Sequence, residues 1–145
     1  MSLRTGLLAD ALAKLNAVGR PAGVPEAELG LGGEAGAPSI LLYWTEDDAR
    51  AVGTSRRAVD VHELTLLVEC RAAEVTALNC YEAVEPFLAW VEAALNGQLL
   101  SGAVREVVMG KSEATMVAEA QLHILVTVEF KVAYQHKVGD VSQAA

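Results

Sequence analysis

Several kinds of residue are scarce in this chain of 145 residues, and each shortage excludes a class of protein. The two cysteines, Cys70 and Cys80, are too few for a disulfide scaffold and have no second pair for a zinc site, so a reducing compartment is expected. Phenylalanine, tyrosine and tryptophan together supply seven residues, which argues against an aromatic ligand cage. No apolar run approaches the roughly 18 residues of a membrane-spanning helix, so we expect no membrane partner.

Positive charge is scarce as well. Eleven lysines and arginines stand against 19 acidic residues, which gives a formal net charge of -8. This balance argues against an electrostatic grip on phosphate backbones, so nucleic acid is not expected to be held. The first residues, Met1–Gly6, lack the basic and apolar regions of a secretory leader, so we expect none.

What the chain has in quantity is aliphatic side chains. Hydrophobic residues make up 52% of it, with alanine, leucine and valine prominent, so the chain can bury a sizeable core. The length is typical of one domain. We therefore predict a single domain over residues 1–138, followed by a flexible tail over 139–145.

The first half of the chain predicts one helix, one long loop and one strand. Apolar residues spaced by three and four predict a helix over 3–18, which should end near Gly19. Residues 19–38 contain six glycines and three prolines without a sustained period, so they are predicted to be a loop. Residues 39–45 are typical of a buried strand, and residues 46–58, with acids first and arginines last, predict a protruding hairpin or loop.

The middle of the chain predicts a second strand and a second helix. In residues 59–71 the apolar side chains change from odd to even positions, which predicts a β-bulge near His62 and Glu63. Asn79 and Glu82 have the spacing of a capping box, so a helix is predicted over 79–96, kinked at Pro86 or regular only from that residue on.

The last part of the chain gives the clearest pattern. Residues 103–109 are predicted to form a short strand and 110–117 a connection. From Ala118 to Tyr134, 17 residues alternate between apolar even positions and mostly polar odd positions. At about 3.3 Å per residue such a strand is long for a domain of this size, so it must bend or project and needs a partner to cover its edges. Oligomerisation is therefore expected.

No motif predicts catalysis or a bound cofactor. The glycines of 30–35 follow a loop instead of a strand, so they do not form a dinucleotide loop. The three histidines show no metal-ligand spacing. Cys80 falls early in the second predicted helix, where a lowered thiol pKa is one interpretation and a buried apolar residue the favoured one. We expect no enzyme, no metal and no cofactor.

The order of predicted elements resembles that of the tail terminator proteins of tailed bacteriophages, the minor tail protein U type. That order is helix, long Gly/Pro loop, strand, polar protrusion, strand, helix, strand, and a long alternating strand. The resemblance covers roughly residues 1–136 and includes the closing run Ile124–Tyr134. It implies an α+β fold, with a mixed, mostly antiparallel sheet of four to five strands, two helices on one face and a long C-terminal strand.

The resemblance also implies a structural function. Such proteins form a hexameric ring that caps the head-proximal end of the tail tube, stops tube polymerisation and provides the head-joining surface. The implied partners are other copies of the chain, the tail tube protein and a head-completion or connector protein, with DNA passing through the lumen unbound. The implied location is the virion tail or neck, after assembly in the cytoplasm of a bacterial host. The particle could be a phage, a tailocin or a gene transfer agent.

Two surfaces are predicted to carry this function. The tube-facing surface is placed on the polar segment, with these residues: Glu46, Asp47, Asp48, Arg50, Arg56 and Arg57. The contact between subunits is placed on the odd face of the long strand, with these residues: His123, Leu125, Glu129 and Lys131. Two alternatives stay open, namely another ring protein of the virion neck and a small cytoplasmic α+β enzyme or ligand-binding module, which would require a deep pocket.

Overall fold

The computed structural model describes the whole chain except residues 1, 18, 31–35, 53–58 and 138–145. Five strands form one sheet in the order β1-β2-β3-β5-β4, in which β1 pairs with β2 in parallel and every other pair is antiparallel. This arrangement confirms the α+β fold with a mixed, mostly antiparallel sheet. The elements are α1 (Leu3–Leu15), β1 (Ala27–Leu29), β2 (Ser39–Val52), β3 (Val59–Ala73), α2 (Ala77–Leu95), β4 (Val108–Ala118) and β5 (Leu122–Lys137).

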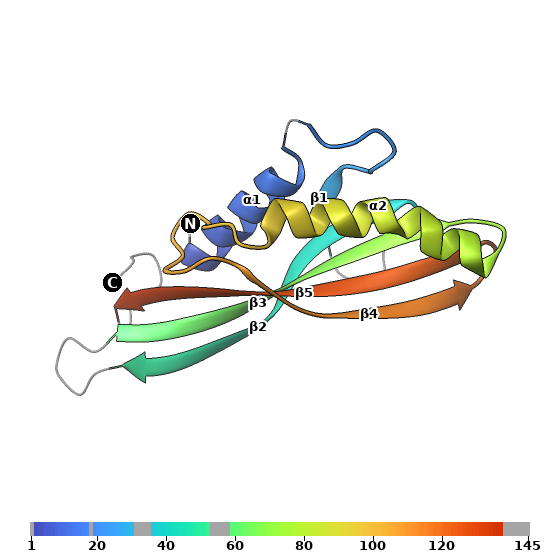
Figure 1. Cartoon of the computed structure of the whole chain (residues 1–145). Coiled ribbons are helices and arrows are strands. Elements are labelled where there is room, and N and C mark those ends of the chain that lie inside the picture. The colour runs from blue at the N-terminus through green and yellow to red at the C-terminus, as the bar shows by residue number, and fades with distance from the viewer. Residues whose placement is uncertain (1, 18, 31–35, 53–58, 138–145) are drawn as a thin grey trace.

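The two helices lie together on one face of the sheet, and the core fills the space between the layers (Figure 1). Even-numbered residues of β3 and β5 point to this covered face, and Leu66, Val68 and Phe130 are fully buried there. Odd-numbered residues of the same strands point to the other face, which we call the open face. The alternation predicted for the last strand therefore has its expected cause, because one side of the strand is buried under helices.

Three strands continue past the end of the β4 pairing and form what we call the arm: residues 47–52 of β2, 59–64 of β3 and 132–137 of β5 (Figure 1). The β4 strand pairs with β5 only as far as Val108 and Lys131, whereas β3 and β5 remain paired to Val59 and Lys137. A bridge from Ala103 to Tyr134 adds a backbone contact along the β5 side of the arm. A projecting strand was expected from the sequence, and three strands share that projection.

Both helices begin at side-chain caps. The Ser2 side chain accepts a hydrogen bond from the Thr5 backbone and starts α1, which ends at Leu15, before the left-handed residue Gly19. Thr76 caps α2 by accepting from the Asn79 backbone, so the cap predicted at Asn79 was three residues late. The α2 helix includes Pro86 within its length, so it does not begin at that residue, and the kink expected there stays a prediction.

Two strand predictions near the C-terminus were wrong. Residues 103–107 form no strand apart from the Ala103 bridge, and the predicted connection at 110–117 lies within β4. Most of the residues of β4 are exposed, because it is an edge strand, so no hydrophobic alternation marks it in the sequence. The alternating run also divides: Ala118 ends β4, a turn follows, and β5 begins at Leu122.

The bulge lies on a different strand from the one predicted. The β3 strand keeps its register through His62, whereas the register of β2 shifts between Trp44 and Glu46. Thr45 is the extra residue, so Trp44 and Asp47 both point to the covered face although an odd number of positions separates them. The polar segment is also more regular than predicted, since 46–52 continues β2. Within the predicted loop, Ala27–Leu29 forms the short strand β1.

Candidate functional site

A cluster of polar side chains joins the arm to α1 on the covered face. The Asp47 side chain is 5% exposed, and its Oδ2 accepts hydrogen bonds from the Tyr134 hydroxyl at 2.5 Å and from Arg4 at 3.1 Å. Its Oδ1 lies 2.6 Å from Nδ1 of His62. The His62 ring stacks on Tyr134 with centroids 4.6 Å apart, and the Arg4 guanidinium lies over the Trp44 ring. One carboxylate thus connects a helix and three strands.

This cluster is suited to holding the arm in place. Burial, together with the hydrogen bond to Asp47 and its charge, raises the pKa of Tyr134, so its hydroxyl keeps its proton and acts as a donor. A protonated phenol that donates to a carboxylate is a poor nucleophile. The bulge at Thr45 is what turns Asp47 toward these partners. Asp47 was predicted from the sequence to lie in the tube-facing surface, and no local pattern indicated this cluster.

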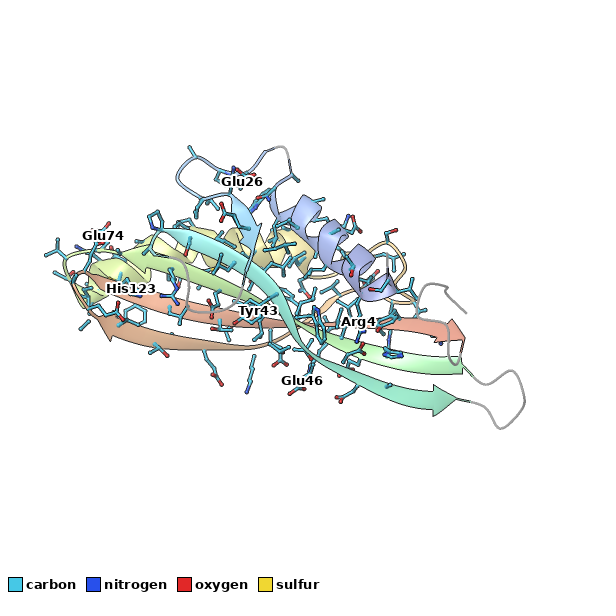
Figure 2. The ribbon with its side chains drawn as sticks, turned by 180° about the vertical axis from the view of Figure 1, so that it is seen from behind. Arg4, Glu26, Tyr43, Glu46, Glu74 and His123 are labelled. Atoms are coloured by element: carbon cyan, nitrogen blue, oxygen red, sulfur yellow. The ribbon has the colours of Figure 1, made fainter. Side chains whose placement is uncertain are left out.

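A second polar cluster lies on the open face, between β2, β3 and β5 (Figure 2). The Tyr43 hydroxyl donates to Glu69 at 2.9 Å, and Arg71 lies 4.0 Å from the second oxygen of Glu69. Nη1 of Arg71 lies 3.2 Å from Nε2 of His123. Glu69, Arg71 and His123 are each less than a tenth exposed, so their charges and polar atoms stabilise one another within the sheet surface.

The Tyr43 hydroxyl makes stability depend on alkaline pH. Burial raises its pKa to about 12, with further contributions from the hydrogen bond to Glu69 and its charge. Because the folded-state pKa is the higher one, Tyr43 contributes stability that is complete below its usual pKa of about 10 and is lost as pH rises toward 12. We expect Tyr43→Phe to flatten this loss in urea unfolding between pH 9.5 and 11.5. An equal fall in stability in both proteins would contradict the assignment.

The residues predicted for the subunit contact all lie on the open face of β5. His123 is buried in the second cluster, while Leu125, Glu129 and Lys131 are half-buried. The Lys131 ammonium donates to Thr65 at 2.7 Å and lies 3.6 Å from the Glu129 carboxylate. A shallow hollow of about 290 Å³ crosses this face, and its lining residues come from four strands: Thr45, Glu46, Thr65, Leu67, Lys111, Glu113, Thr127 and Glu129. The prediction that this face contacts a second subunit stays a prediction.

The residues predicted for the tube-facing surface are divided by the structure. Glu46 and Asp48 are exposed, whereas Asp47 points to the covered face and is held by the cluster around it. Arg50 lies in the described backbone of β2. Arg56 and Arg57 fall outside the described residues.

The remaining candidates for chemistry are buried or dispersed. Cys70 and Cys80 are fully buried free thiols, and burial raises the pKa of Cys70 to about 12, as expected of core residues. Within the described part of the chain, no group of three or more His, Cys, Asp or Glu side chains is placed to hold a metal ion. No helix among the described residues is long and apolar enough to cross a membrane.

Comparisons with known proteins find 24 similar chains among solved structures. No family model and no curated protein matches the chain. Among solved structures, a chain of the "Virion of native gene transfer agent (GTA) particle" aligns with a TM-score of 0.49 and 16% identity. The alignment covers 93% of this chain and 92% of that one. An identity and TM-score this low do not transfer a function from one chain to the other.

Proposed function

We propose that this protein is the tail terminator of a phage or phage-like particle, a ring subunit that caps the head-proximal end of the tail tube. In this function it stops tube polymerisation and offers the surface to which the head is joined. The proposal starts from the resemblance in element order given above. The elements α1, β2, β3, α2, β4 and β5 follow one another in the order on which that resemblance rests.

The observation that carries the proposal is the arm. The base of the arm is packed, since Leu64, Val132 and Tyr134 are buried, but β4 does not continue along it and a bridge at Ala103 borders its β5 side. Projecting strands expose backbone edges that proteins cover with another element or another subunit. A subunit with such an arm is suited to assembly, in which the arm reaches a neighbouring chain.

The acidic net charge of the chain fits a channel through which DNA slides. The net charge of -8 opposes retention of phosphate, so a ring of such subunits would surround DNA without binding it. The predicted tube-facing contact then depends on the arginines of the arm and of the segment between β2 and β3. The alternative of another neck ring protein has the same acidity and assembly, and differs in its partner.

The test combines the mass of the purified protein with its effect on tail tubes. We expect rings of six subunits, free or only on tube ends, in light scattering and electron microscopy. Arg57→Glu should leave the rings intact and abolish capping, so that tubes grow beyond their normal length. Lys14→Glu, which reverses a charge on α1 outside both predicted contact surfaces, should cap normally. A monomer or dimer that ignores tubes would exclude the terminator function.

A further inference from the structure

Exposed apolar side chains gather at the end of the molecule opposite to the arm. Eight large hydrophobic residues are exposed in the described part of the chain, and three of the eight lie within residues 75–81. Val75 is 89% exposed, Leu78 67% and Tyr81 49%. We call these three residues the turn-end patch, because they lie where β3 leads into α2, close to the turn between β4 and β5 (Figures 1 and 2).

The three side chains of the turn-end patch are exposed to solvent instead of being packed into the core. Val75 directly precedes the cap residue Thr76, a position from which an apolar side chain often packs against the fourth residue of the helix. That fourth residue, Cys80, is fully buried, whereas Val75 remains in solvent. Leu78 and Tyr81 are three residues apart, so they share one side of α2 and continue the patch away from the sheet.

The rim of the patch carries charge of one sign. Glu74, Glu82, Glu85 and Glu119 are exposed around it, and the backbone N–H of Glu74 donates to Leu122, which holds the β4–β5 turn at this end. Between Arg71 and Arg105 the sequence contains no lysine or arginine, and none occurs between Lys111 and Lys131. The two segments that carry these four glutamates, 72–104 and 112–130, therefore contain no lysine or arginine.

Two segments outside the described residues start at the other end of the molecule. Residues 138–145 follow Lys137, which lies at the far end of the 16-residue strand β5. That strand is about 50 Å long, whereas eight extended residues span at most about 28 Å. The residues between Val52 and Val59 begin and end at the same far end.

We propose that the turn-end patch is a docking surface for a protein that presents an apolar side chain surrounded by lysine or arginine. An apolar centre with a charged rim is the usual arrangement of a protein interface, and here the rim requires a cationic partner. The same carboxylates repel nucleic acid and anionic lipid surfaces. This inference does not depend on the terminator function, since it concerns the end of the molecule away from the arm.

Three synthetic peptides of equal length test the proposal by fluorescence anisotropy with the full chain. The first alternates leucine and lysine on a helical pattern, the second replaces each lysine with glutamate, and the third replaces each leucine with serine. We expect only the first to bind. Leu78→Ser and the double variant Glu82→Gln/Glu85→Gln should each weaken its binding about tenfold or more.

Matched controls come from the opposite end of the same helix layer. Leu99→Ser removes a side chain that is 61% exposed, and Glu92→Gln removes a carboxylate of α2 outside the rim. Both should bind the leucine–lysine peptide as the wild type does, and all variants should keep the unfolding midpoint of the wild type.

Three outcomes would overturn the proposal. Binding of the serine–lysine peptide as tight as that of the leucine–lysine peptide would reduce the effect to attraction between opposite charges. Binding unchanged by Leu78→Ser would place it elsewhere. Self-association that Leu78→Ser abolishes, measured by light scattering, would make a second copy of the chain the occupant.

Discussion

Asp47→Ala is expected to lower the free energy of unfolding by about 3 kcal/mol, because it removes one acceptor shared by three side chains. Tyr134 and Arg4 donate to this carboxylate, and His62 lies 2.6 Å from it. Hydrogen bonds to a buried charged group are each worth about 1.5–3 kcal/mol, and the exposure of Arg4 reduces its own contribution. Urea unfolding of the variant and the wild type at pH 7 measures the difference.

The neighbouring residue gives the control for this prediction. Asp48→Ala removes an identical carboxylate one position along β2, on the open face, where the side chain is exposed. Its free energy of unfolding should stay within about 0.5 kcal/mol of the wild-type value, as is usual for surface substitutions. Equal effects of the two substitutions would mean that general charge reduction, and not the cluster, determines stability.

A double-mutant cycle separates the partners of Asp47. Tyr134→Phe removes the hydroxyl that lies 2.5 Å from Oδ2 and keeps the ring that stacks on His62. If the two groups act together, the double variant should be more stable than the sum of the single effects predicts, by about 1 kcal/mol or more.

The cluster around Asp47 shows what the sequence does not reveal. Asp47 is 15 residues from His62, 43 from Arg4 and 87 from Tyr134, so no local spacing connects them. Their meeting depends on strand register and on the bulge at Thr45, which reverses the side chains that follow it. When the bulge is not known, Asp47 is grouped with its neighbours Glu46 and Asp48 in one exposed polar segment.

The position of a strand could be predicted from the sequence where one of its faces is buried, as in β5, and could not be predicted where most of its residues are exposed, as in β4. Even positions of β5 are apolar because helices cover them, and the alternation identified that strand to within four residues at its start. The exposed edge strand β4 has no such constraint, and it was assigned to a connection. The change of parity in β3 suggested a bulge because Val59 and Val61 were counted as core. Val61 is instead half-buried on the open face, where it lines a hollow beside Arg105.

The residues predicted for the subunit contact lie on the open face of β5, which is more than a plain polar surface. Glu69, Arg71 and His123 are buried there through their contacts with one another. Of these three residues, only His123 was predicted from the sequence as a contact residue. Glu69 and Arg71 lie on β3, whose odd positions show no regular polar pattern. His123 is already bonded to Arg71 within the subunit, so Leu125, which is half-buried and apolar, is the predicted contact residue with the fewest polar contacts of its own.

Phe130→Ala is expected to destabilise the fold by about 3–5 kcal/mol, the largest effect of any substitution considered above. Phe130 is fully buried at the centre of the sheet, where β5 pairs with Leu66 of β3 and with Met109 of β4. Removing its ring leaves a cavity between the sheet and the helices that the close-packed surroundings can fill only in part. Domains of this size are stable by about 5–15 kcal/mol, so the variant should lie near the limit of folding.

Urea unfolding gives the midpoint and the slope m, the dependence of the unfolding free energy on urea concentration. Two control variants distinguish a cavity from a general loss of structure. Phe130→Leu should cost less than half as much, since it retains most of the volume. Leu125→Ala, on the half-buried open face of the same strand, should cost about 1 kcal/mol. A lower midpoint with an unchanged slope for Phe130→Ala would mark a cavity in an intact fold. Equal costs for Phe130→Ala and Leu125→Ala would contradict a core confined to the covered face, and with it the division of the sheet into a packed face and an open face available to other chains.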